Sequence, residues 1–177
     1  MYGAGQSAMR NLLPETTFLH CEFNPSFDGQ APEPIHKNLS ELSDLISISE
    51  DIDLGIATDG DADRIGLYNS TGKFIDSHHI ILLLIQYLHK YKRMSGKVVN
   101  SFSCTGKIKN LCKHYRLEQE VTKIGFKYIC DIIITEDVLI GGEESGGIAI
   151  KGHIPERDGL WIGLTILEFM AATGKSL

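Results

Sequence analysis

The sequence of 177 residues lacks several features that would place it in common functional classes. No two of its four cysteines have C-x-x-C spacing, so we do not expect a zinc site. The longest apolar run, residues 80–85, is far too short to span a bilayer. The net charge of −6 argues against a nucleic-acid surface and against binding to anionic membranes. With no recognisable secretory leader, we expect a cytoplasmic protein with free thiols.

Sequence motifs of several large enzyme groups are also missing. There is no G-x-S-x-G elbow, no P-loop and no G-x-G-x-x-G following a strand. Hydrolases of the elbow type and nucleotide-binding folds therefore receive little support. The chain opens on a glycine-rich turn (residues 3–5) with no strand before it, and we expect the first domain to be truncated at its N-terminus.

Three carboxylates are concentrated in residues 59–64 (DGDADR), between two strand-like stretches. Asp59, Asp61 and Asp63 repel one another unless a cation lies among them. Oxygen ligands without cysteine or histidine favour a hard cation such as Mg²⁺. Arg64 cannot bind that metal, but its planar guanidinium can hold a phosphate beside it.

Two other interpretations apply to these residues. Asp and Gly form turns, and many such loops only reverse the chain. An EF-hand loop needs glycine at its sixth position and glutamate at its twelfth. Counted from Asp59, those positions hold Arg64 and Ser70, so the EF-hand interpretation fails.

The periodicity of apolar residues predicts alternating strands and helices, which indicates an α/β fold. We place a domain boundary near residue 76, giving domains 1–76 and 77–177. Asn38 and Glu41 have the spacing of a capping box at a helix start. Helices are predicted over 6–13, 39–48, 79–93, 105–115, 125–134 and 159–172, and strands over 18–23, 53–58, 65–68, 97–102, 118–122 and 138–141.

Further polar motifs lie in the second half. Residues 141–147 (GGEESGG) follow a predicted strand, and their glycines would let the backbone approach a ligand closely. A flexible hairpin turn is the plainer interpretation. Lys123 and Lys127 flank a strand-to-helix turn, where Lys127 opposes the helix dipole; phosphate binding, proton transfer and simple surface exposure all remain open. Asp158, after Arg157, is a candidate N-cap for the last helix.

With these motifs in order, the chain resembles the α-D-phosphohexomutases, the superfamily of phosphoglucomutases and phosphomannomutases. Residues 58–64 resemble that family's metal loop and residues 142–147 its sugar-recognition loop. Residues 125–127 and 157–159 follow in the family's order. The resemblance covers essentially the whole chain. It implies two three-layer α/β domains with mixed sheets flanked by helices, equivalent to domains 2 and 3 of a four-domain enzyme.

The resemblance also implies a mechanism, in which a phosphoserine gives its phosphoryl group to a hexose phosphate through a bisphosphorylated sugar. Domain 1, with that serine, and domain 4, with a phosphate-binding loop, would be missing partners from the same parent chain. Asp59, Asp61 and Asp63 would hold Mg²⁺, with a phosphoserine oxygen as a further ligand. The catalytic residues would be Arg64 and Lys127, and the substrate-binding residues would be Lys123, Glu143, Ser145 and Arg157.

Gly147 stands where some relatives have histidine, and this favours glucose or mannose phosphates over glucosamine phosphate. Two other functions remain alternatives. One is a stand-alone module that binds a metal or sugar phosphate without turnover, and the isolated chain is expected to be inactive in any case. The other is a phosphatase of the haloacid dehalogenase type, whose aspartate nucleophile would lie in a D-x-D loop after a strand.

Overall fold

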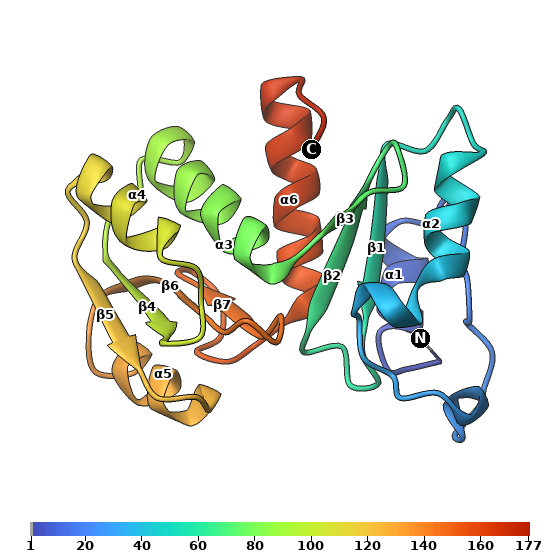
Figure 1. Cartoon of the computed structure of the whole chain (residues 1–177), viewed down its shortest axis with the longest axis horizontal. Coiled ribbons are helices and arrows are strands. Elements are labelled where there is room, and N and C mark those ends of the chain that lie inside the picture. The colour runs from blue at the N-terminus through green and yellow to red at the C-terminus, as the bar shows by residue number, and fades with distance from the viewer. Residues whose placement is uncertain (1) are drawn as a thin grey trace. The chain divides into compact units, whose positions relative to one another are not determined.

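The computed structural model describes residues 2–177, which form two compact units (Figure 1). The first unit runs to Asp76 and takes up the chain again at Gly159–Leu177; the second unit is Ser77–Asp158. The predicted boundary at residue 76 coincides with the point where the chain first passes from one unit to the other. The division into domains 1–76 and 77–177 stays a prediction, because the last helix belongs to the first unit.

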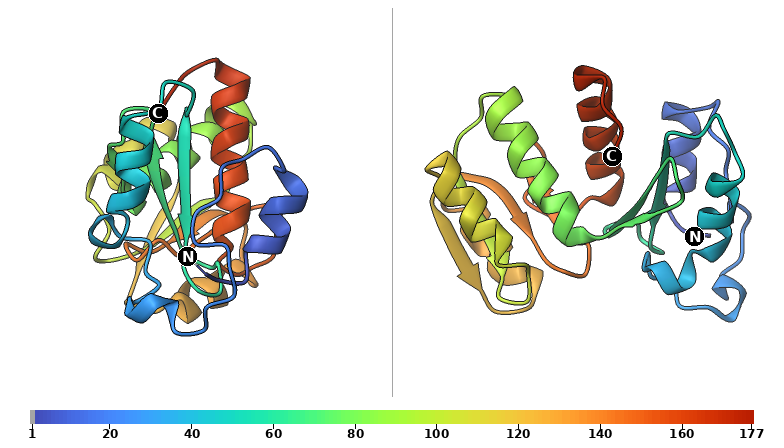
Figure 2. Two further views of the ribbon diagram at one scale, coloured as in Figure 1. Left: turned by 90° about the vertical axis from the view of Figure 1, so that its right-hand side faces the viewer. Right: turned by 45° about the horizontal axis from the view of Figure 1, so that its top comes forward.

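A three-stranded antiparallel sheet forms the centre of the first unit, in the order β1 (Leu54–Thr58), β2 (Ile65–Asn69) and β3 (Phe74–Ile75). Helix α2 (Ser40–Ser47) covers one face, and α6 (Gly159–Thr173) covers the other together with α1 (Gln6–Leu12) (Figure 2, left). This arrangement follows from the way successive side chains of β1 point to opposite faces of the sheet. Gly55 faces Ile46 of α2, whereas the next side chain, Ile56, contacts Gly163 of α6.

The second unit has a four-stranded mixed sheet in the order β5-β4-β6-β7. Strand β4 pairs in parallel with both β5 and β6, and β6 pairs antiparallel with β7. Gly141 of β6 faces α5, while Gly142 faces α3, so these helices cover opposite faces. The elements are α3 (Ser77–Gln86), β4 (Lys97–Ser101), α4 (Lys107–Tyr115), β5 (Gln119–Thr122), α5 (Phe126–Ile133), β6 (Val138–Gly142) and β7 (Ile148–Ile150).

Apolar residues at helical spacing account for the buried faces of the long helices. In α3, Ile80, Ile81 and Leu84 are fully buried, and in α6 the same holds for Ile162 and Ile166. The α/β fold class is therefore confirmed, with the qualification that the described strands of the first sheet are all antiparallel. None of the helices in residues 2–177 combines the length and apolar character that a bilayer crossing requires.

Several local predictions were wrong. Residues 18–23 are not a strand, because no strand of the described chain pairs with them. The capping box does not form: the Asn38 amide donates to the Glu33 carbonyl (3.1 Å), and Glu41 pairs with His20 (2.7 Å).

The helix predicted over 79–93 ends its α-helical part at Gln86 and continues as one π-helical turn, Tyr87–Tyr91. Strands β3 and β7 were not predicted. Short 3₁₀ turns span Phe27–Gly29 and His36–Asn38.

Candidate active-site loops

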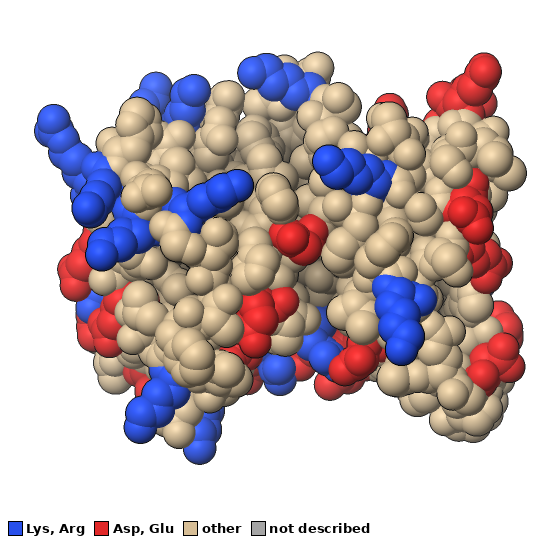
Figure 3. All heavy atoms as spheres, viewed as in Figure 1, with Lys and Arg blue, Asp and Glu red and all other residues tan. Residues whose placement is uncertain are grey.

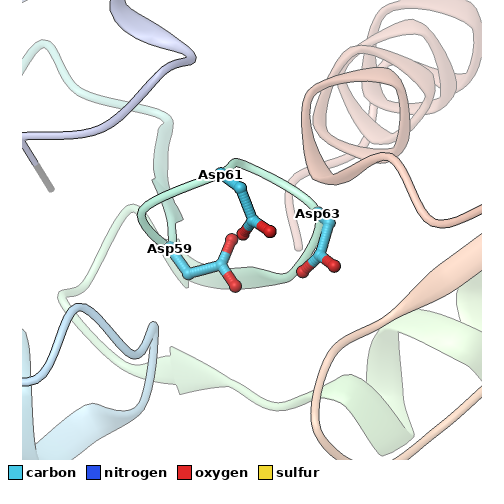
Figure 4. Close-up of side chains that lie close together, drawn as sticks. All are labelled: Asp59, Asp61 and Asp63. Atoms are coloured by element: carbon cyan, nitrogen blue, oxygen red, sulfur yellow. The ribbon is translucent and has the colours of Figure 1, made fainter.

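The acidic loop joins β1 to β2, and its three aspartates turn their carboxylates toward one another (Figure 4). One carboxylate oxygen from each of Asp59, Asp61 and Asp63 lies within 4.8 Å of the others. Asp59 is buried, Asp63 is half-buried and Asp61 is exposed. The loop thus groups a fixed inner carboxylate with two that solvent reaches.

Arg64 fixes the buried carboxylate. Its Nε donates to Asp59 Oδ2 at 2.6 Å, and its backbone N–H donates to Oδ1 at 3.1 Å. Burial opposes ionisation of Asp59, but these hydrogen bonds outweigh it and hold the pKa of Asp59 below its ordinary value. The same contacts raise the pKa of Arg64 against the effect of its own burial. Asp59 is therefore a charged carboxylate at neutral pH, held in one orientation.

The backbone of the acidic loop is held from two sides by segments distant in the sequence. The Ala4 N–H donates to the Gly60 carbonyl (2.9 Å), and the Gly159 N–H donates to the Ala62 carbonyl (2.9 Å). A Cβ on Gly159 would lie 2.6 Å from the Arg64 carbonyl oxygen. Ala62 itself has a positive φ of 64°, which a non-glycine residue seldom adopts. The loop conformation therefore depends on the close backbone contacts that Ala4 and Gly159 make with it.

The chemistry of the donor set fits a magnesium ion. Mg²⁺ binds oxygen ligands at about 2.1 Å, so its ligands lie about 3 Å apart when adjacent and about 4 Å when opposite. The 4.8 Å limit on the three aspartates is close to that geometry, and the trio contains no nitrogen or sulfur ligand. A small closure of the loop would bring all three carboxylates to one ion.

The glycine-rich loop of the second unit joins β6 to β7, and one of its predicted sugar ligands is strongly held. Glu143 is only 5% exposed, and its Oε1 accepts a hydrogen bond from the Gly125 N–H at 2.7 Å. Gly125 begins the turn that carries Lys127. The bond therefore ties the glycine-rich loop to the lysine-bearing turn, and Ser145 stands exposed at the tip of the loop.

The two predicted lysines lie near one aromatic ring. Lys127 Nζ is 4.9 Å from the centroid of the Tyr128 ring, and Lys123 Nζ is 6.0 Å from it. Both lysines are exposed. Their ammonium groups are therefore accessible to an anion while the tyrosine ring provides a cation–π surface.

Arg157 crosses the glycine-rich loop, and Gly147 makes room for it. A Cβ at residue 147 would lie 2.4 Å from Arg157 Cδ. The Arg157 guanidinium lies over the Phe126 ring, with its Cζ 5.4 Å from the ring centroid. Glycine at 147 thus allows the arginine to lie beside both Phe126 and the loop, and a histidine there would require Arg157 to move.

Sequence reasoning missed the residues that position the loop from the side of β4. Glu144 Oε2 accepts hydrogen bonds from the hydroxyls of Ser101 (3.1 Å) and Ser103. The Ser77 hydroxyl donates to the Glu144 carbonyl at 2.5 Å. The one available signal was the position of Ser101 and Ser103 at the carboxyl end of a predicted strand. Parallel strands end at a common edge of the sheet, so these serines would be expected near the loop that follows another such strand.

Both loops occupy the same place in their units. Each connects two antiparallel strands that follow a helix: α2, β1 and β2 in the first unit, and α5, β6 and β7 in the second. Of the predicted residues, the first unit therefore groups Asp59, Asp61, Asp63 and Arg64, and the second groups Lys123, Lys127, Glu143, Ser145 and Arg157.

Family models match both parts of the chain. The model described as phosphoglucomutase/phosphomannomutase, alpha/beta/alpha domain II matches residues 1–72, and that of domain III matches residues 76–177. The chain belongs to the phosphoglucomutase/phosphomannomutase family. The resemblance inferred from the sequence is thereby confirmed, and this family consists of phosphotransferring mutases.

The chain is similar to several longer members of the family. It is 34% identical over 126 residues to a phosphoglucosamine mutase of Rubrobacter xylanophilus, an alignment covering 71% of this chain and 28% of the relative. A phosphoglucosamine mutase of Pseudomonas fluorescens is 26% identical over 176 residues, which is 99% of this chain and 39% of the relative. The chain thus spans well under half the length of these relatives.

Solved structures of the family share the fold. The putative phosphomannomutase of Thermus thermophilus superposes with a TM-score of 0.90 at 35% identity, over 99% of this chain and 41% of that one. An N-acetylphosphoglucosamine mutase of Aspergillus fumigatus, solved with GlcNAc-6P and magnesium, has a TM-score of 0.70 at 16% identity. The names of these relatives differ in the sugar, so the preference drawn from Gly147 for glucose or mannose phosphates stays a prediction.

Proposed function

We propose that this chain forms the two central domains of a Mg²⁺-dependent phosphohexomutase, which interconverts hexose 1-phosphates and 6-phosphates through a phosphoserine and a bisphosphorylated sugar. The supporting observations are membership in the family, the trio of aspartates and the glycine-rich loop with its lysines. Because the relatives are longer, the serine-bearing and phosphate-binding domains are assigned to further parts of the same polypeptide. We also retain the expectation of a reducing cytoplasm, with which the four free thiols agree.

In this proposal, Asp59, Asp61 and Asp63 hold the metal, which would neutralise charge on the phosphoryl group being transferred. Arg64 has two tasks. Its Nε keeps Asp59 ionised and oriented, and the remaining guanidinium nitrogens can reach a phosphoryl oxygen. A lysine at position 64 would keep the charge but could not perform both tasks at once.

The second unit would bind the sugar. Ser145 presents an exposed hydroxyl. Oε1 of Glu143 accepts a hydrogen bond from the Gly125 N–H, and its other carboxylate oxygen would accept a hydrogen bond from a sugar hydroxyl. Lys123 and Arg157 would bind the phosphate that is not being transferred, and Lys127 would transfer a proton at the reacting hydroxyl. Such a loop suits a substrate that must be bound in two orientations. Groups that accept hydrogen bonds from sugar hydroxyls can bind either end of the sugar.

The single observation that carries the proposal is the convergence of three carboxylates on one point, with Asp59 fixed by Arg64, in a chain of this family. We expect this chain to bind Mn²⁺, a spectroscopic substitute for Mg²⁺, at one site detectable by electron paramagnetic resonance. Asp61→Asn should weaken this binding at least tenfold, because it removes one of three anionic ligands. Asp44→Asn, an exposed aspartate of α2, serves as the matched control and should leave the affinity unchanged.

Turnover should be assayed in the full-length polypeptide from the source genome, with glucose 1-phosphate, mannose 1-phosphate and glucosamine 6-phosphate as separate substrates. We expect conversion of at least one of them, with glucose or mannose phosphate preferred, and a loss of at least a hundredfold in kcat for Asp61→Asn. A well-folded full-length protein that converts none of the three would refute the mutase proposal. Hydrolysis of an aryl phosphate by the 177-residue chain alone would favour the phosphatase instead.

A stand-alone module that binds a metal or a hexose phosphate without turnover is the second candidate, because the trio of aspartates and the glycine-rich loop are both present in this chain. It predicts that the endogenous protein in its source cells has an intact mass near 19.6 kDa. It also predicts measurable affinity of this chain for a hexose phosphate, without turnover. A much larger endogenous mass would exclude this candidate.

A further inference from the structure

The second unit contains a basic segment that the proposed mutase site does not use. Residues 77–117 include six lysines and two arginines, and all 23 acidic residues of the chain lie outside this segment. Net charge alone disfavours a nucleic-acid surface, yet a chain with a net charge of −6 can still carry one strongly basic face. Figure 3 shows basic side chains gathered at the upper left, over α4 and the end of α3. This part of the surface attracts anions although the chain as a whole is acidic.

Helices α3 and α4 lie side by side and run in the same direction. At their beginnings, the Thr105 N–H donates to His78 Nδ1 at 3.3 Å. At their ends, the centroid of the His89 ring lies 4.9 Å from that of the Tyr115 ring. His89 belongs to the π-helical turn Tyr87–Tyr91, which continues α3. The basic residues that follow or end the two helices are therefore brought to one end of the pair: Lys90, Lys92, Arg93, Lys113 and Arg116.

Helix α4 carries more positive charge than its own stability favours. Its first turn contains Lys107 and Lys109 and no acidic residue, although the helix dipole favours carboxylates at that end. Lys109 and Lys113 are four residues apart, and like charges at that spacing destabilise a helix. All three lysines are exposed. The stability of α4 therefore does not explain its charge.

An arginine with a left-handed backbone follows each helix. Arg93 has a φ of 58°, and Arg116, at the end of α4, has a φ of 57° and a ψ of 36°. Glycine is favoured at such positions, because it has no Cβ to crowd the neighbouring carbonyl. A cation is favourable near a helix C-terminus, but Lys90 and Lys113 already supply one there. The two exposed arginines are thus better explained by what their side chains bind than by the fold.

Aromatic rings lie among these cations. Tyr91 is 39% exposed, and Lys90 Nζ lies 5.4 Å from the centroid of its ring. On α4, the ring of the exposed His114 lies 4.9 Å from the Tyr115 ring. A π-helical turn is rare and is often found at functional sites, and this one presents Tyr91 to solvent. The surface therefore offers flat rings as well as positive charge.

This combination fits single-stranded nucleic acid better than other polyanions. The phosphates of a single strand bind lysine and arginine, and its unpaired bases stack on aromatic rings. A helix that binds membranes needs apolar side chains that enter the bilayer. The exposed residues of α4 are all polar, and its Ile108 and Cys112 are buried. An acidic peptide would use the cations and leave the rings unused.

We propose that the paired helices α3 and α4 form a binding surface for single-stranded nucleic acid, in addition to the mutase site. Phosphates would bind its cations, and a base would stack on Tyr91. The surface lies within the second unit and uses no residue of the glycine-rich loop or of the lysine-bearing turn. We call it the basic helix surface, and it consists of Lys90, Tyr91, Arg93, Lys109, Lys113 and Arg116.

The experiment measures binding of a fluorescein-labelled oligouridylate of about 12 nucleotides to the 177-residue chain by fluorescence anisotropy. The logarithm of the association constant should fall with the logarithm of the salt concentration, with a slope of about −2 to −3.5 for about three to five neutralised phosphates. Lys113→Gln with Arg116→Gly should weaken binding at least about fivefold and reduce the slope by about 1.4. Arg116→Gly alone should keep or raise the thermal midpoint, because glycine suits the backbone there.

Tyr91 distinguishes base stacking from charge. Tyr91→Ala should weaken binding at least about fivefold, whereas Tyr91→Phe, which keeps the ring, should bind like the unsubstituted chain. Lys73→Gln, at an exposed lysine of the first unit, is the matched control and should leave the affinity unchanged. Lys123→Gln with Lys127→Gln should also leave it unchanged, because those lysines are assigned to the mutase site.

Four results would overturn the proposal. One is the absence of saturable binding at about 50 mM salt. Another is equal affinity of the Lys113→Gln, Arg116→Gly variant and the Lys73→Gln control. A third is loss of binding on Lys123→Gln with Lys127→Gln, which would place the strand at the lysine-bearing turn. The fourth is equal or tighter binding of polyglutamate or of phosphatidylserine vesicles, which would assign the surface to an acidic peptide or a membrane. None of these readouts uses metal, sugar or turnover, so the mutase proposal can fail or stand independently.

Discussion

Glu144 is held by hydroxyl donors, and its ionisation should contribute to the stability of the second unit. Burial opposes the charged form, but the hydrogen bonds from Ser103 and Ser101 outweigh this effect and lower the pKa of Glu144. A carboxyl whose pKa is lower in the folded than in the unfolded state binds fewer protons when folded. It therefore stabilises the fold above its unfolded pKa, and this contribution is lost as the pH falls through the folded pKa.

We expect Ser103→Ala to lower the thermal midpoint at pH 7, by the equivalent of about 1 kcal/mol for a partly exposed charge-assisted hydrogen bond. The difference from the unsubstituted chain should shrink as the pH falls from 5 towards 3. Ser95→Ala, at an exposed serine of the same unit, is the control and should change neither the midpoint nor its pH dependence. A difference that stays constant down to pH 3 would show that Ser103 acts without Glu144. Thermal unfolding followed by circular dichroism provides the measurement.

At the scale of elements, the start of α6 and the acidic loop depend on one another. Gly159 is the first residue of the helix, and alanine there would ordinarily favour helix formation. Its Cβ would, however, lie 2.6 Å from the Arg64 carbonyl and 2.9 Å from the Ala62 carbonyl, which are backbone atoms that cannot rotate away. The acidic loop would have to shift, and the three carboxylates would shift with it.

Gly159→Ala should therefore destabilise the chain by about 1–3 kcal/mol, as overpacking does elsewhere, and should also weaken Mn²⁺ binding. Gly106→Ala is a matched control at the start of α4. Its Cβ would meet nothing within 4 Å, and its φ of −63° suits any residue, so stability and affinity should stay unchanged. Denaturant unfolding and a metal titration measure the two effects. Equal stability of both variants would mean that the acidic loop moves to accommodate the Cβ of Ala at position 159 without any loss of folding free energy.

Local patterns predicted most of these elements but not the ones that depend on distant partners. The apolar spacing of α3 and α6 was sufficient, because a helix satisfies its own backbone hydrogen bonds. Residues 18–23 have strand composition, yet a strand exists only where a neighbour pairs with it. Similarly, the aspartates and the glycine-rich loop were recognisable as motifs. Their positioning partners, Ala4, Gly159 and Ser103, lie far away in the sequence, and no local pattern links them to these loops.

At the scale of the whole molecule, the chain leaves the first unit at Asp76 and returns to it at Gly159. Helix α6 then covers one face of the first sheet, where it buries Ile162, Ile166 and Phe169. The family model for domain III nevertheless extends over residues 76–177 and includes this helix. A division of the chain by sequence thus differs from a division by packing.

Deleting residues 159–177 should consequently unfold the first unit rather than the second. Without α6, one face of the β1–β2 pair is exposed, including Ile56 and Ile65, which contact Gly163. The second unit keeps α3, α4 and α5 around its own sheet. In amide hydrogen exchange, we expect β1 and β2 to lose protection while β4 and β6 retain it. Loss of protection in β4 and β6 instead would contradict the assignment of α6.

The matching position of the acidic loop and the glycine-rich loop has a consequence for how such a molecule evolves. Exposed turn residues such as Asp61 and Ser145 contribute little to a hydrophobic core, so substitutions at such positions would leave the two sheets in place. One module, copied within a gene, could thus acquire carboxylates in one copy and sugar-binding groups in the other without a change of architecture. A lineage that needs another sugar would be selected first at these two turns, and its inherited sheets would remain as they are.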